Sequence, residues 1–337
     1  MEDEFRIADY VSSLLGESQL IRREKQGQGI HVPMFLDACI TNHGNLQSAG
    51  RYGHKSYQSE PAFPEEKRYL QAADWDDVFF DAERLGIRIV FLSGGEPLMR
   101  RCILEKAANH HRIFFPVVTN GSLLDASYMD FLVKNRNLVP MLKIGPDMDV
   151  AQTAQHSFLY GRLMQCMELL RMRRIVFGVS ICVTHYNYRR ILTKAYLNEL
   201  YRRGCSVVLY EEYVPESPEK EGLGLSPVVR DYVEETLERM QNDFPELLMT
   251  MLPRTETEAN RSILLREGCF RIDPTGVVHT GPNRCDGTLN VFELPLQEIL
   301  KDSLYQCFQA ARPVRPEMPG YVSYKNAFAG QEKRTSK

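Results

Sequence analysis

The chain of 337 residues lacks several features that would assign it to a simple functional class. It contains no run of about 18 apolar residues, which argues against a membrane-spanning helix. Its net charge is −3, so no overall positive field points to nucleic acid as a partner. The acidic N-terminus, residues 1–5, has no signal-peptide pattern. We therefore expect a cytoplasmic protein whose partners include neither a membrane nor a nucleic acid.

The cysteines lack the spacing of a metal site or of a disulfide framework. No two of them form the Cys-x2-Cys pair that zinc sites favour, and their scatter indicates no set of disulfides. Cysteine content alone therefore predicts no metal centre. The eight cysteines stand at positions 39, 102, 166, 182, 205, 269, 285 and 307.

Short apolar runs alternate with amphipathic stretches along most of the chain, and the pattern predicts six strand–helix units. Such units form a parallel sheet, and right-handed crossovers curl it into an incomplete TIM-like (β/α)6 barrel, an α/β fold. The predicted strands are 34–40, 88–93, 113–118, 139–144, 175–183 and 206–213, and the predicted helices are 72–85, 98–109, 124–135, 156–172, 188–203 and 226–243.

Shorter segments flank this barrel. An amphipathic helix is expected over residues 5–15, a turn over 273–276 and a short helix over 295–310. The last residues are rich in proline, glycine and charge, which is typical of a flexible tail. The predicted divisions are an N-terminal segment 1–30, the barrel 31–245, a C-terminal extension 246–311 and the tail 312–337.

The interior of the barrel, the lumen, is predicted to be charged. Side chains alternate between the two faces of a strand, so an apolar set beneath the helices turns the intervening residues inward. In the first strand the set under the helices is Met34, Leu36, Ala38 and Ile40, and in the last strand Glu212 is predicted to point inward beside Tyr210. The candidate catalytic residues of this lumen are Asp37, Cys39, Lys143, Cys182 and Glu212.

Two interpretations of this lumen stay open. A buried lysine is costly without a carboxylate, so Lys143 and a carboxylate could form an internal ion pair beside two buried thiols. The same groups could instead form a polar pocket that binds or processes a ligand.

A motif follows the second predicted strand, where Ser93-Gly94-Gly95-Glu96-Pro97 comes directly after an apolar run. A second motif, residues 41–52, follows the first strand and reads TNHGNLQSAGRY. Together with FFPVVTNGSLLD, KNRNLVPMLKI, FGVSICVT and VVLYEEYVP, these motifs resemble the radical S-adenosylmethionine (SAM) superfamily, in the branch with a C-terminal cysteine-bearing extension. The resemblance covers roughly residues 31–310 and implies a partial TIM barrel that binds SAM over a 4Fe-4S cluster.

The cluster ligands of that family are missing. Its Cys-x3-Cys-x2-Cys triad aligns with Gly44, Ser48 and Arg51. Glycine has no side chain, serine is a poor ligand for iron–sulfur clusters, and arginine keeps a positive charge. We therefore expect no 4Fe-4S cluster and no reductive cleavage of SAM.

The resemblance nevertheless implies a set of SAM-binding positions. In the family, the two glycines and the glutamate hold the SAM amino group, and Arg51 could pair with the SAM carboxylate. The alternative is an inherited tight turn in which Glu96 caps a helix that starts at Pro97. The cofactor-binding candidates are Gly94, Gly95, Glu96, Pro97, Arg51, Tyr52, Asn120 and Ser180, and S-adenosylmethionine is the ligand to be tested.

Metal binding by other cysteines is a minor alternative. Cys269, Cys285 and Cys307 could supply three thiolates in the extension, and Cys39 and His43 stand near the lost cluster. Loose spacing favours three unconnected thiols in the extension, while Cys39 is most simply a buried small hydrophobic residue and His43 a solvated loop histidine.

Three functions are therefore weighed. The first is a pseudoenzyme that binds a small molecule, a peptide or an active radical SAM partner protein. The second is an enzyme with non-radical chemistry, SAM-dependent or acid–base, in the remodelled lumen. The third is a metalloenzyme with unusual cluster ligands. The loss of the primary ligands from an intact frame favours the first.

Overall fold

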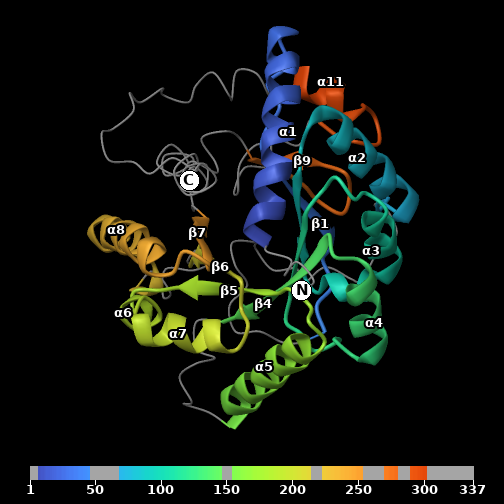
Figure 1. The fold of residues 1–337 in the computed structure, drawn as a ribbon. Coiled ribbons are helices and arrows are strands. Elements are labelled where there is room, and N and C mark those ends of the chain that lie inside the picture. Colours follow the sequence, from blue (N-terminus) through green and yellow to red (C-terminus); the bar gives the residue numbers. More distant parts are fainter. Residues whose placement is uncertain are drawn as a thin grey trace, which may run out of the picture.

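A computed structural model describes residues 7–45, 68–145, 154–213, 222–252, 269–279 and 289–301 of the chain. It confirms the expected α/β fold, a curved, mostly parallel sheet with helices on its outer side (Figure 1). The strands of the barrel are β1 (Phe35–Thr41), β2 (Ile89–Gly94), β3 (Phe115–Thr119), β4 (Leu138–Ile144), β5 (Gly178–Val183) and β6 (Val207–Glu212).

The helices follow the strands in the expected order. In Figure 1, α2, α3 and α4 lie one after another beside the strands, and α5 to α8 continue this arc. Within the described segments, no helix is both long and apolar enough to cross a bilayer. The helical elements are α1 (Ile7–Gly27), α2 (Ala72–Leu85), the 3-10 turn η1 (Pro97–Arg100), α3 (Arg101–Ala108), α4 (Ala126–Lys134), α5 (Ala154–Met172), α6 (Tyr188–Ile191), α7 (Lys194–Arg202), α8 (Pro227–Asp243) and α11 (Leu296–Lys301).

One predicted helix, 188–203, is divided into α6 and α7. The division falls at Thr193, whose side chain accepts a hydrogen bond from the backbone N–H of Tyr196. Threonine at this position is a favoured N-cap, so it starts a new helix instead of continuing the first.

The sheet extends at both edges beyond the predicted strands, in the order β7-β6-β5-β4-β3-β2-β1-β8-β9. The strand β7 (Leu248–Leu252) pairs parallel with β6, and β8 (Cys269–Ile272) pairs parallel with β1. The strand β9 (Val278–His279) is antiparallel to β8. All three come from the segment that the sequence places in the C-terminal extension. They are short or irregularly patterned, which is why periodicity does not reveal them.

A carboxylate holds the turn between β8 and β9, where the sequence predicts a turn. Asp273 Oδ1 accepts hydrogen bonds from the backbone N–H groups of Thr275 and Val277, at 2.8 and 3.1 Å. Its other oxygen lies 3.2 Å from Nε2 of His279. Gly276 has a φ of 83°, a conformation that favours glycine. This turn places β8, and with it Arg271, beside β1.

The main hydrophobic core lies between the outer face of the sheet and the helices. On β1, Leu36, Ala38 and Ile40 are fully buried and pack in this core with Trp75 and Phe79 of α2. The alternation predicted for these three residues is therefore confirmed. The prediction that Met34 lies under the helices with these residues is wrong, because Met34 precedes β1 and packs in a second cluster with α1.

Helix α1 closes the inner side of the barrel at the amino ends of the strands. Its residues Ile7, Val11 and Leu14 pack against inward residues near the starts of β1, β2, β4 and β6. Ser18 Oγ donates to the carbonyl of Gly86 just before β2, at 2.7 Å. The helix ends at Gly27 and not near residue 15, because the charged stretch after residue 21 consists of Arg, Lys, Glu and Gln, which are good helix formers.

We expect Leu14→Ala to lower the free energy of unfolding by about 2–4 kcal/mol, since it removes a side chain from this inner cluster. Leu20→Ala, at a site 69% exposed on the same helix, should change it by less than about 0.5 kcal/mol. Urea unfolding of both variants checks the result, and equal losses would contradict the placement of α1.

A charged lumen as the candidate functional site

The inner face of the sheet keeps some solvent exposure, in contrast to the outer face. Inward residues are partly exposed on five strands, whereas their sequence neighbours on the outer face are buried. Polar groups therefore gather inside the barrel above the apolar cluster of α1. We call this set the lumen residues: Asp37, Ser93, Lys143, Glu211 and Arg271.

The register of β6 corrects one prediction. Tyr210 and Glu212 lie on the outer face, where the Tyr210 hydroxyl donates to the carbonyl of Ile191. The side chain of Glu212 is 1% exposed and accepts two hydrogen bonds from Arg230 of α8, at 2.7 and 2.8 Å. Glu212 is thus a buried structural partner of Arg230, and Glu211 is the carboxylate of the lumen.

This one-residue shift has a simple cause. The strand reads Val-Val-Leu-Tyr-Glu-Glu, so both faces are apolar before the two glutamates, and alternation does not choose between them. A signal was present in the partner helix. Arg230 shares the buried face of α8 with Val233 and Leu237, and a buried arginine calls for an anionic partner.

Lys143, Ser180 and Glu211 lie side by side on β4, β5 and β6. Lys143 is in register with Ser180, and Glu211 is in register with Cys182. The Ser180 hydroxyl donates a hydrogen bond to Oε1 of Glu211. Lys143 Nζ lies 3.5 Å from the carbonyl oxygen of Gly94. Burial raises the pKa of the Glu211 carboxyl, and the Ser180 hydrogen bond and the charge of Lys143 oppose that rise.

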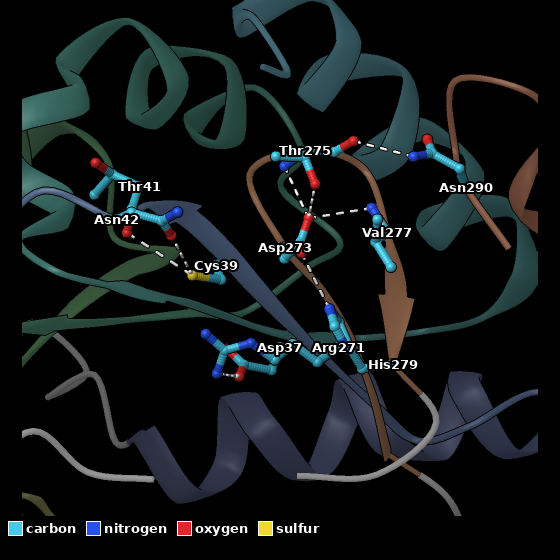
Figure 2. Close-up of polar contacts among 10 residues, drawn as sticks. All are labelled: Asp37, Cys39, Thr41, Asn42, Arg271, Asp273, Thr275, Val277, His279 and Asn290. Atoms are coloured by element: carbon cyan, nitrogen blue, oxygen red, sulfur yellow. Dashed lines mark hydrogen bonds and ion pairs between the residues drawn. The ribbon is translucent and has the colours of Figure 1, made fainter. Parts of the chain in front are cut away.

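Asp37 belongs to a separate, internally paired group. Ser93 donates a hydrogen bond to Oδ1 of Asp37. Arg271 donates to Oδ2 at 3.0 Å (Figure 2). The sequence analysis places Asp37 in the lumen but misses both partners. Arg271 comes from β8, a strand that periodicity does not predict.

The thiols of the lumen are not in an activating environment. Cys39 is fully buried, and its Sγ lies 3.8 Å from the carbonyl of Thr41 and 3.9 Å from Oδ1 of Asn42 (Figure 2). Burial raises the pKa of the Cys39 thiol, although the charge of Arg271 opposes this. A thiol with a raised pKa is a weak nucleophile and a weak metal ligand. Cys182 is also fully buried.

The glycines of the SGGEP turn are required by close packing. A Cβ added at Gly94 would meet the carbonyl oxygen of Thr41 at 2.0 Å, and one at Gly95 would meet that of His43 at 1.9 Å. The backbone N–H groups of Gly95 and Glu96 donate to these same carbonyls, at 2.8 and 2.6 Å. The turn after β2 is thus fastened to the end of β1, and its Gly94 carbonyl lies within reach of Lys143.

Glu96 joins this turn to the end of β3. It is fully buried, and Oε1 accepts hydrogen bonds from Thr119 Oγ1 at 2.7 Å and from the N–H of Leu98 at 3.1 Å. Oε2 accepts from the N–H of Asn120 at 2.9 Å. Burial raises the pKa of its carboxyl, while these donors oppose that rise. Both oxygens of Glu96 are thus bound within the protein itself.

Some of the remaining candidate residues lie in the described part of the chain, and the others lie outside it. Pro97 starts η1 and is buried, and the Asn120 side chain donates to Oδ1 of Asn45 at 2.9 Å. Gly44 is described and supplies no side-chain ligand for a cluster. Within the described segments, no three His, Cys, Asp or Glu side chains are grouped as a metal site. The predicted positions Ser48, Arg51, Tyr52, Cys285 and Cys307, and the side chain of Cys269, lie outside the described residues.

Replacing each of the two adjacent glutamates of β6 by glutamine should have very different effects on the free energy of unfolding. Glu212→Gln should cost about 3–5 kcal/mol of unfolding free energy, because it leaves the buried Arg230 without its counter-charge. Glu211→Gln should change it by no more than about 1 kcal/mol at pH 7, because the amide still accepts the Ser180 hydrogen bond. Urea unfolding at pH 7 checks both predictions. A larger loss for Glu211→Gln than for Glu212→Gln would instead support the sequence prediction that Glu212 points inward.

Glu211 should also impose a pH dependence on stability. Its raised pKa means that the folded state takes up this proton more readily than the unfolded chain, so the stabilisation is complete below the ordinary value of 4.5 and is lost as the pH rises through the folded pKa. The stability of the wild type relative to Glu211→Gln should therefore fall as the pH rises from 4.5 through the folded-state pKa of this carboxyl. Unfolding of both proteins across that range measures it, and a difference that grows with pH would refute the assignment.

Comparison with solved structures identifies similar folds. No protein-family model matches the chain. The crystal structure of Streptococcus suis SuiB bound to S-adenosylmethionine matches with a TM-score of 0.64 and 15% identity, over 86% of this chain and 70% of that one. SuiB bound to the precursor peptide SuiA matches with a TM-score of 0.63 and 14% identity, over 87% and 70%. Native anSMEcpe with bound AdoMet and the Cp18Cys peptide matches with a TM-score of 0.57 and 18% identity, over 84% of each chain. The chain therefore has the fold of the radical SAM enzymes.

Proposed function

We propose that this protein binds SAM or a related small molecule in the lumen, holds no 4Fe-4S cluster and does not cleave SAM reductively. The observation that carries the proposal is a contrast within one site. The cluster positions read Gly44, Ser48 and Arg51, whereas the lumen keeps charged groups at the carboxyl ends of the strands. In parallel barrels, ligands bind at that end of the sheet.

The nearest thiol does not replace the missing ligands. Cluster iron is held by thiolates, and Cys39 is a buried thiol whose pKa is raised. The residues present therefore fit SAM better than they fit the cluster. The proposed contacts are the turn residues Gly94 and Gly95, together with Asn120, Ser180, Arg51 and Tyr52.

A non-radical enzyme is the second candidate, and Glu211 is the observation that favours it. A carboxyl with a raised pKa suits general acid–base work, and this one contacts Ser180 with Lys143 nearby. Peptide ligands also belong to the proposal, since the similar structures of SuiB and anSMEcpe include peptide complexes. An active radical SAM protein is the proposed macromolecular partner.

The test combines three measurements on anaerobically purified protein. We expect iron well below one atom per chain, saturable binding of SAM by calorimetry, and no 5′-deoxyadenosine after incubation with SAM and dithionite. Stoichiometric iron or formation of 5′-deoxyadenosine would overturn the cluster-free proposal. Absence of SAM binding would overturn the SAM part and favour a partner-binding scaffold.

Restoring the thiols provides a gain-of-function control. After reconstitution with iron and sulfide, the variant Gly44→Cys/Ser48→Cys/Arg51→Cys should take up roughly four irons per chain. The matched variant Gly44→Ser/Arg51→Ser changes the same loop without thiols and should take up none. If the wild type binds as much iron as the cysteine variant, other ligands hold the cluster.

A further inference from the structure

Two opposite charges in the lumen have no ion-pair partner in the described part of the chain. Lys143 and Glu211 belong to none of its salt bridges, and each makes one hydrogen bond, to the Gly94 carbonyl and from the Ser180 hydroxyl. The Asp37 carboxylate, by contrast, is paired with Arg271 at 3.0 Å. The outward Glu212 is likewise occupied by Arg230.

The strand β5 holds these two charges apart. Neighbouring strands lie about 4.8 Å apart, so the backbones of β4 and β6 are separated by about 10 Å. Between them the inner face of β5 carries the short side chain of Ser180, in register with Lys143 and hydrogen-bonded to Glu211. The charges still interact through space, since Lys143 counters the rise in the Glu211 pKa. The result is a cation on β4 and an anion on β6, on either side of the buried side chain of Ser180.

We propose that Lys143 and Glu211 together bind the α-amino acid moiety of a ligand, its carboxylate on Lys143 and its ammonium on Glu211. A lysine ammonium has three donors, and here one of them reaches Gly94 at 3.5 Å. In Glu211, Ser180 occupies Oε1, and within the described residues no donor reaches Oε2. A zwitterion matches both charges at once, whereas a plain anion would be repelled by Glu211 and a plain cation by Lys143.

The inference rests on the proposed function, since it names how the lumen would hold its ligand. The same moiety occurs in a free amino acid and at one end of SAM. Three probes separate these sources: SAM, L-methionine, which lacks the adenosine, and 5′-methylthioadenosine, which lacks the amino acid.

The experiment is calorimetric titration of each probe into the full chain, in the wild type and in Lys143→Met and Glu211→Gln. SAM or methionine should bind the wild type at least about tenfold more tightly than 5′-methylthioadenosine. Each lumen variant should weaken that binding by about ten- to a hundredfold, because a charge-assisted hydrogen bond is lost. Lys134→Met and Glu105→Gln, which remove exposed charges elsewhere, should leave the affinity unchanged.

The outcomes separate the inference from the proposed function. Binding of SAM that both lumen variants retain, or equal affinity for 5′-methylthioadenosine in the wild type, overturns the inference and leaves SAM binding intact. Binding of methionine without SAM supports the inference and identifies a free amino acid as the ligand. If no probe binds the wild type, both are overturned. The comparison of 5′-methylthioadenosine with SAM and methionine uses only the wild-type protein, so it tests the inference even if a variant fails to fold.

Discussion

The carboxylate of Glu96 joins the carboxyl ends of β2 and β3, and much of the site depends on that bond network. It accepts hydrogen bonds from Leu98, Thr119 and Asn120 while fully buried. A buried carboxylate is stable only when donors surround it, so these three segments are held in one arrangement. The tight contact of Gly94 with the end of β1 completes the bracing. The carbonyl that Lys143 contacts is thereby fixed in place.

The two faces of the sheet differ in polarity and burial. The outer face is apolar and covered by helices, and its one buried ion pair, Glu212 with Arg230 in the described part of the chain, fastens α8 to β6. The inner face is apolar near α1 and polar toward the carboxyl ends of the strands. A protein with this division can change the chemistry of its lumen without changing its core.

Much of the fold could be predicted because strong local patterns agree with the tertiary structure. The apolar faces of β1 and β5 follow strict alternation, and α2 spans the predicted residues 72–85. The strands of the C-terminal extension could not be predicted in the same way, because β8 is stabilised by pairing with β1, more than 200 residues away in the sequence. Of the lumen residues, Lys143 and Asp37 follow from alternation, whereas Ser93 and Arg271 become visible only as partners of Asp37.

The sequence by itself determined the fold class and the order of the strand–helix units. These features depend on residue identity and on local periodicity, and both can be read from the amino-acid sequence. Tertiary structure alone decided which of two adjacent glutamates enters the lumen, since both faces of β6 are apolar and only Arg230 of α8 draws Glu212 outward. It also decided that Glu96 is a buried brace, because the three donors come from separate segments that meet only in the folded barrel.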